Sequence, residues 1–307
     1  MVEAVTAILF GWLFYVYYMT GFRPEFSDAG FRQTWPAFLV QLTLIGGLIA
    51  ATVIDARLYI ISLQIPWLTT LVAMLVLPVG MWQLPGMKDV CPEVNRAGVG
   101  AALGGAIALI MAIGLLRIGW LPYSFLEEQN GNGPPQEQDL PPTQAMLSHP
   151  YPRREVTKEL PFVLLPLIGS LIGVWVSLNY NQTQTPLPPW VRVLSGTICG
   201  YLTGAGMVWF TRIFGTWAFG REAMGLGDVH LLAAIGTVVG PWDTMLVFFI
   251  APFIGLIGAI LVVGVSRMIK GEVRVIPYGP YLAAAAVVIM ICRRPLLEFL
   301  KIYGLAA

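Results

Sequence analysis

Two aspartates stand at the ends of long apolar stretches and have the residue type needed for acid–base chemistry. Asp55 ends the apolar run 45–54, and Asp228 follows Gly225-Leu226-Gly227 and opens the next apolar run. Ionisable side chains within or beside membrane-spanning segments are costly to insert, so each is a functional candidate. Asp55 stands at the end of one apolar run and Asp228 at the start of another, so we expect both to lie near one membrane face.

A pair of carboxylates held close together can activate water. Both cannot ionise cheaply at short range, so one keeps a proton while the other acts as a base. The ionised member takes a proton from a water that attacks a peptide carbonyl, and the protonated member hydrogen-bonds the carbonyl oxygen as charge develops. Asp55 and Asp228 are therefore candidate catalytic residues of an aspartic-type endopeptidase, a chemistry that requires no metal or other cofactor.

Each aspartate also has a simple structural explanation. An Asp just before a helix caps free backbone N–H groups, and glycines before Asp228 would then only form a turn. Asp55 would mark a helix end at the membrane interface and pair with Arg57. Taken one at a time, Asp228 fits its structural role better than a catalytic one, and Asp55 fits its structural role at least as well.

The composition indicates which elements must position the two aspartates. Of 307 residues, 57% are hydrophobic and 11% are charged, whereas a soluble domain has about 25% charged residues. Apolar runs of about 17 residues or more recur along the chain, each long enough to cross a hydrocarbon core of roughly 30 Å as a helix. Stretches such as 101–116 do not alternate, which argues against a transmembrane barrel. The sequence predicts an all-α polytopic transmembrane bundle of about 8 spanning helices.

The predicted helices divide the chain into three parts. Spanning segments are expected near residues 3–20, 36–54, 66–84, 98–120, 160–179, 190–213 and 277–293, and a helical pair covers 228–268. The first member of that pair, 228–239, is only about half a membrane thick. Residues 121–159 are rich in Glu, Gln, Asn, Gly and Pro and are expected to form a hydrophilic, disordered loop. We interpret this loop as a tether between residues 1–120, which carry Asp55, and residues 160–307, which carry Asp228.

Glycines at four-residue spacing predict close helix packing. Gly196, Gly200 and Gly204 share one helical face, and Gly100 and Gly104 repeat the spacing. Small residues at this spacing let helix backbones approach closely. We interpret both groups as packing seams.

The charge and the cysteines narrow the classes of partner. A formal net charge of +1 offers no basic face for nucleic acid. The three cysteines form no C-x-x-C pair, so neither a zinc ribbon nor a disulfide framework is predicted. The lipid bilayer is the partner that the composition itself implies.

The segments around both aspartates resemble the prepilin peptidases, which are membrane aspartic proteases of the G-x-G-D class. The stretch GREAMGLGDVHLLAAIG at 220–236 is similar to the second catalytic motif of that family. Val53-Ile54-Asp55 resembles the segment with the first catalytic aspartate, and IPYGPYLA at 276–283 resembles the segment after the last cytoplasmic loop. Residues 2–10 resemble the start of the second spanning helix of the prepilin peptidases. The resemblance covers most of the chain outside 85–189.

This resemblance implies cleavage of type IV prepilins and related pseudopilins at the cytoplasmic face of the bacterial inner membrane. It makes Asp55 and Asp228 the catalytic dyad. Glycines beside the second aspartate would let the substrate backbone approach, and the turn before the last helix would shape the site. The residues implied to bind substrate are Gly225, Gly227, Pro277, Gly279 and Pro280.

The sequence departs from the family pattern at several positions. Ser62-Leu63 stands where the family often has Pro-Asp, and His230 stands where lysine is usual. We interpret His230 either as a pH-sensitive neighbour of Asp228 or as a solvated residue of the first helical turn. Many members carry two C-x-x-C pairs linked with N-methylation of the new pilin terminus. Methyltransferase activity is not expected here, because the sequence has no such pair.

Two alternatives remain at the level of the sequence. A transporter or assembly subunit would use the same carboxylates to bind protons or ions, and a catalytically silent family member would serve as a scaffold. A protease needs both carboxylates at one depth, whereas a proton relay would stagger them across the membrane. A weak lysine and arginine bias agrees with a cytoplasmic position for Asp55.

Overall fold

The computed structural model describes residues 2–58, 61–124, 152–180, 186–269 and 278–302, and this part of the chain contains helices and no strand. Its elements in chain order are α1 (Val2–Tyr18), α2 (Pro24–Ala29), α3 (Phe31–Leu58), α4 (Gln64–Gln83), η1 (Pro85–Met87), α5 (Arg96–Ile118), α7 (Pro152–Thr157), α8 (Pro161–Tyr180), α9 (Pro189–Phe219), α10 (Leu226–Val239), α11 (Pro241–Ile269) and α12 (Gly279–Ile302). The all-α bundle predicted from composition is confirmed.

The helices have the length and surface of a multi-pass membrane protein. Within the described residues, six helices are long and apolar enough to cross a membrane, and three shorter apolar helices lie at 6–18, 226–239 and 279–293. Large apolar side chains point outward; Ile110 is 70% exposed and Phe253 is 67% exposed. Lipid accepts such surfaces whereas water does not. Each predicted segment corresponds to one of these helices, and the expected half-membrane segment is α10.

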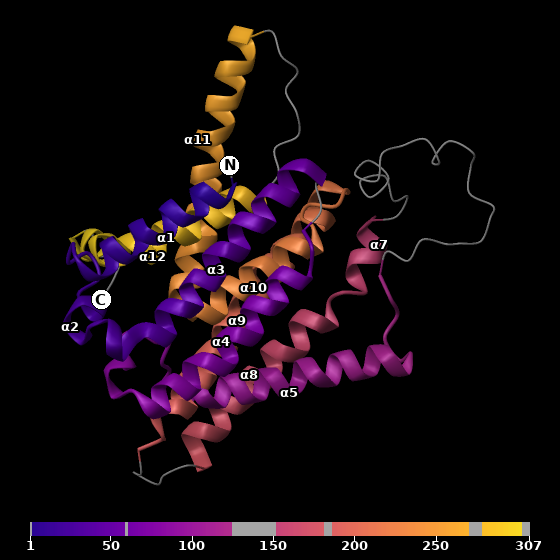
Figure 1. Ribbon diagram of the computed structural model, residues 1–307. Helices are drawn as coiled ribbons and strands as arrows, with labels where there is room; N and C mark the ends of the chain where they lie inside the picture. The colour runs from indigo at the N-terminus through magenta and orange to yellow at the C-terminus, as the bar shows by residue number, and fades with distance from the viewer. Residues whose placement is uncertain (1, 59–60, 125–151, 181–185, 270–277, 303–307) are drawn as a thin grey trace.

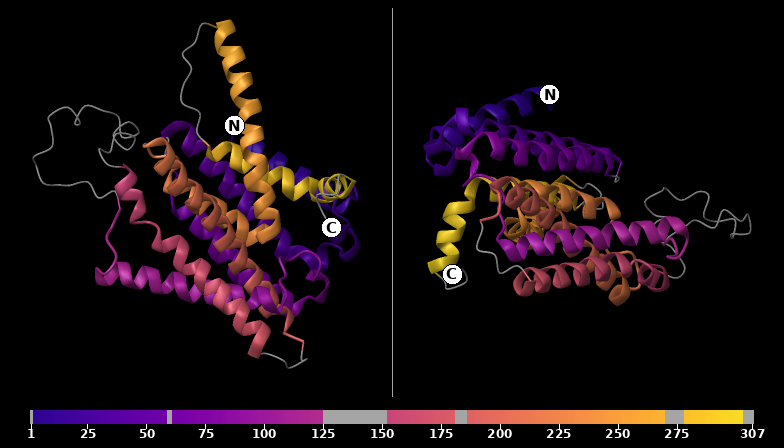
Figure 2. Two further views of the ribbon diagram at one scale, coloured as in Figure 1. Left: turned by 180° about the vertical axis from the view of Figure 1, so that it is seen from behind. Right: turned by 90° about the horizontal axis from the view of Figure 1, so that it is seen from below.

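The helix α10 lies in the middle of the bundle. It contacts α3, α4, α9, α11 and α12, and residues 228–238 are buried apart from His230. The pair α5 and α8 lies along one edge, and α1 lies at the opposite edge beside α3 (Figures 1 and 2). The last part of α11 extends beyond its neighbours (Figure 1). The short helix α10, which carries Asp228 in its first turn, is therefore enclosed by longer helices.

The predicted glycine seam sets the depth of α10 in the bundle. A Cβ atom added at Gly200 would overlap the carbonyl group of Gly236, and one at Gly204 would overlap that of Leu232. The two helices are therefore antiparallel and in backbone contact. The C-terminal end of α9 consequently lies beside the first turn of α10.

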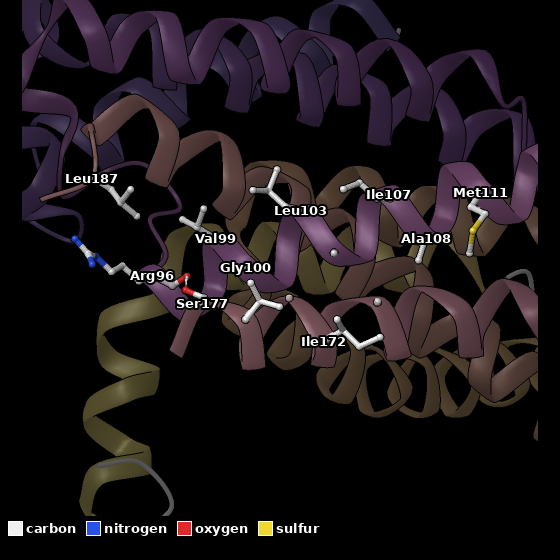
Figure 3. A pocket seen from close by; sticks show the side chains of 14 residues that line it. Arg96, Val99, Gly100, Leu103, Ile107, Ala108, Met111, Ile172, Ser177 and Leu187 are labelled. Atoms are coloured by element: carbon white, nitrogen blue, oxygen red, sulfur yellow. Dashed lines mark hydrogen bonds between the residues drawn. The ribbon is translucent and has the colours of Figure 1, made fainter. Parts of the chain in front are cut away.

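A second glycine seam joins α5 and α8. Gly100 and Gly104 face the carbonyl groups of Gly173 and Gly169, again in antiparallel order. An apolar groove of about 720 Å³ opens beside this seam, with Arg96 at one end (Figure 3). Neither aspartate lines this groove, so it is separate from the candidate site.

The end of the predicted loop at 121–159 is ordered. Residues 152–157 form α7, and the side chains of Val156 and Glu159 are buried. Residues 125–151 lie outside the described part of the chain. The boundary between loop and bundle therefore lies before α7, because a buried carboxylate ties residue 159 to the helices around it.

Candidate active site

Asp55 lies in the last turn of α3 and is only 6% exposed. The backbone of Gly279, the first residue of α12, hydrogen-bonds its carboxylate. A Cβ atom added at Gly279 would stand 2.5 Å from Asp55 Oδ2, so the glycine backbone touches the carboxylate directly. Among the described residues, the ion pairs do not include one between Asp55 and Arg57, which is exposed. The structural explanation through that pair is therefore not realised.

Asp228 lies inside the first turn of α10 and is 9% exposed. The helix begins at Leu226, and its N-cap is Gly225, which makes no side-chain cap bond. The carboxylate of Asp228 instead receives a hydrogen bond from the backbone of Gly225. This is the third-position half of a capping box, in which an acidic side chain reaches back to the N-cap amide. The Asp228 carboxylate thus caps the start of α10 and also lies near Asp55.

The fold brings the two aspartates together from distant parts of the sequence. Their carboxylates interact electrostatically across the interface of α3 and α10. Ile61, in the connection after α3, packs against both Gly227 and Gly279, which links the two sides of the site. The arrangement places two buried carboxylates at one end of the helices, where they can share a proton.

The other predicted site residues differ in their surroundings. A Cβ atom at Gly225 would meet nothing closer than Asp228 Oδ2 at 3.8 Å, so the space beside this exposed residue is open. A Cβ atom at Gly227 would stand 2.7 Å from Ile61 Cβ, so this glycine is needed for packing. Pro280 is the second residue of α12, where its missing N–H costs nothing. Pro277 lies outside the described residues.

Tyr278 is a site residue that the sequence reasoning passed over, although it lies in the quoted segment 276–283. Burial, with a smaller contribution from the nearby Asp228 carboxylate, raises the pKa of Tyr278 to about 12. Its hydroxyl group therefore stays protonated at neutral pH and is available as a hydrogen-bond donor. A polar side chain immediately before Gly279 is the signal that could have revealed it.

His230 points away from the dyad. Positions two apart on a helix lie on nearly opposite faces. The half-buried ring of His230 lies 5.9 Å from the Trp67 ring, at an interplanar angle of 39°. This packing differs from both interpretations made from the sequence, because the ring is neither fully solvated nor directed at Asp228.

A buried arginine is the second feature that sequence reasoning missed. Arg212 in α9 is 1% exposed and pairs with Glu159 and Glu222. It also interacts electrostatically with Asp228. The available signal was an arginine near the end of an apolar helix, which requires a partner.

Comparison with known proteins finds a family match for the part of the chain that contains Asp228. Residues 157–263, which include Asp228, match the type IV leader peptidase family. That match begins within the stretch 85–189, where no resemblance was expected, and it contains neither Asp55 nor residues 276–283. The curated relatives include prepilin leader peptidase/N-methyltransferases of Pseudomonas putida (32% identical over 125 residues), Aeromonas salmonicida (32% over 128) and Pseudomonas aeruginosa (33% over 127).

The aligned region covers only part of each protein. It includes 40% of this chain and 40% of the Pseudomonas putida protein, 41% of each for Aeromonas salmonicida, and 41% of this chain and 37% of the Pseudomonas aeruginosa protein. The chain thus spans about two fifths of the length of these relatives in alignment. No solved structure matches. Residues 157–263 thus match the type IV leader peptidase family, in agreement with the resemblance to the prepilin peptidases that the sequence showed.

Proposed function

We propose that this protein is a membrane aspartic endopeptidase that removes the leader peptide from type IV prepilin-like or pseudopilin substrates, with Asp55 and Asp228 as its catalytic dyad. The observation that carries the proposal is the burial of two carboxylates from different helices on the two sides of Ile61, close enough to interact electrostatically. The family match of the segment that contains Asp228 supplies the substrate class.

The mechanism follows from two carboxylates that share one proton. The ionised aspartate removes a proton from a water molecule, whose oxygen attacks the scissile carbonyl carbon. The protonated aspartate donates a hydrogen bond to the carbonyl oxygen as negative charge develops there. When the tetrahedral intermediate collapses, the C–N bond breaks and the leaving amine takes up a proton from the dyad. The neutral Tyr278 hydroxyl and the open backbone beside Gly225 would help to hold the substrate next to Asp228.

The position of the carboxylates favours a protease over a proton relay. Asp55 lies at the C-terminal end of α3, and Asp228 lies at the N-terminal end of α10. Both interact at one depth, whereas a relay would stagger its carboxylates across the bundle. A cytoplasmic location of this end agrees with the weak bias of basic residues. N-methylation is not part of the proposal, although the relatives' names include it, because the sequence has no C-x-x-C pair.

Co-expression with a prepilin tests the proposal. The wild type should yield the shortened pilin on an immunoblot, and Asp55→Asn or Asp228→Asn should each abolish it while leaving membrane insertion unchanged. Asp243→Asn is a matched control, because Asp243 is also buried in the first turn of a helix but pairs with Arg293 instead. We expect this control to cleave normally. Full cleavage by either dyad variant would contradict the two-aspartate mechanism.

A further inference from the structure

The guanidinium group of Arg212 connects three parts of the chain beneath the candidate site. Its Nε atom donates to Glu159 Oε2 at 3.0 Å, and its Nη2 atom donates to Glu159 Oε1 at 3.2 Å. Its Nη1 atom bonds the Glu222 carboxylate and the carbonyl oxygen of Met224. Only a planar, forked donor can serve a bidentate carboxylate and a separate carbonyl oxygen at the same time.

The bond to Met224 reaches the dyad through a single peptide unit. The carbonyl group of Met224 and the N–H group of Gly225 belong to the same planar peptide. Arg212 donates a hydrogen bond to the oxygen of this peptide, and the N–H group of Gly225 donates one to the Asp228 carboxylate. Holding the carbonyl oxygen fixes the direction of the N–H bond. It also polarises the peptide so that the N–H group becomes a stronger donor.

The surrounding residues hold Arg212 itself in place. Trp209 Nε1 donates to Glu159 Oε2 at 2.7 Å, and Ser124 Oγ donates to Glu159 Oε1 at 3.0 Å. The backbone N–H group of Ala223 donates to Thr216 Oγ1 at 3.1 Å, which fixes the other end of the same turn. The guanidinium group therefore has a defined orientation relative to Met224 and does not act only as a diffuse charge.

We propose that Arg212 is a positioning residue for Asp228, which acts by fixing and polarising the Met224–Gly225 peptide that binds the catalytic carboxylate. This inference rests on the proposed function for its effect on turnover. Its structural part, an ordered turn at 223–228 maintained by Arg212, does not depend on that function.

Three variants separate positioning from simple stability. Arg212→Lys keeps the positive charge but cannot reach Glu159 and Met224 together. The double variant Arg212→Met with Glu159→Gln removes the two most buried charges of the cluster and leaves unpaired only Glu222, whose side chain is 14% exposed. The amide oxygen introduced at position 159 can still accept the bond from Trp209. Arg192→Lys is the matched control, because Arg192 lies at the other end of α9 and pairs with Glu93 at 2.8 Å.

Cleavage kinetics and hydrogen exchange are measured together in purified, detergent-solubilised protein. We expect Arg212→Lys to lower kcat about 30-fold while KM changes less than about threefold. The double variant should have the same thermal midpoint as the wild type and still show the lower kcat. In both, backbone amides of 223–228 should exchange about tenfold faster than in the wild type or in Arg192→Lys.

The outcomes distinguish this inference from the proposed function. If the wild type cleaves prepilin and the double variant matches the wild type in both thermal midpoint and turnover, Arg212 has only a stabilising role and the inference is overturned. If the wild type cleaves no prepilin, the proposed function fails. Hydrogen exchange then decides by itself: faster exchange confined to 223–228 supports positioning by Arg212, and unchanged exchange there rejects it.

Discussion

Replacing Gly279 by alanine should damage catalysis without damaging the fold. The added Cβ atom would stand 2.5 Å from Asp55 Oδ2, whereas ordinary contacts begin at 3.4 Å, so the carboxylate must retreat by about 0.9 Å. Gly279 does not have a positive φ, and it is the first residue of α12, so alanine suits its backbone conformation. The strain therefore falls on the Asp55 side chain.

The expected loss follows from that displacement. A misplacement of about 1 Å in a reacting group costs on the order of 100-fold in rate, which corresponds to about 2.7 kcal/mol of activation free energy. The assay is the initial rate of prepilin cleavage by purified protein, with the thermal midpoint measured on the same sample. We expect kcat to fall about 100-fold and the thermal midpoint to stay the same or rise slightly.

The control for this experiment is Gly206→Ala in α9, where an added Cβ atom meets nothing within 4 Å. This variant should retain both activity and stability. A Gly279→Ala enzyme that cleaves at the wild-type rate would refute the reasoning, because it would mean that the position of Asp55 against α12 does not matter for the reaction.

Two further predictions concern residues beside the dyad, and a third concerns a cysteine elsewhere in the chain. Gly225→Ala should fold normally, because its Cβ atom makes only ordinary contacts, and should raise KM for prepilin about tenfold if the substrate backbone passes there; an unchanged KM would remove Gly225 from the binding surface. Tyr278→Phe should lower kcat about tenfold through the loss of one donor. The folded-state pKa of Tyr278, about 12, lies above its ordinary value of 10.0, so its contribution to stability is complete below pH 10 and is lost as the pH rises towards 12. Denaturant titrations across this range should show a decline in the wild type that is smaller in Tyr278→Phe. Burial, together with the nearby Glu93, raises the pKa of Cys91 to about 12, so at pH 8 its alkylation by iodoacetamide should be at least about tenfold slower than that of a free thiol, as mass spectrometry of the labelled peptide can measure.

The helices, their membrane character and the two candidate carboxylates could all be predicted from local sequence. Hydropathy acts over about 20 consecutive residues, so the runs that became α3, α5 and α9 were recognisable without knowledge of their neighbours. The seam through Gly200 and Gly204 was equally local, because residues four apart share one face of any helix. The G-x-G-D stretch identified Asp228 by its immediate neighbours.

The groups that surround those carboxylates were set by helix packing and could not be predicted in this way. Local patterns do not specify which helices become neighbours, how deep each one lies or which face it turns inward. The contact of Gly279 with Asp55, the approach of Tyr278 to Asp228 and the direction of the His230 ring all depend on that packing. The pairing of Arg212 with Glu159 joins two residues that a hydropathy profile treats separately. Their physical reason is shared: a buried charge must find its partner in space, and the distance along the chain does not determine which partner it finds.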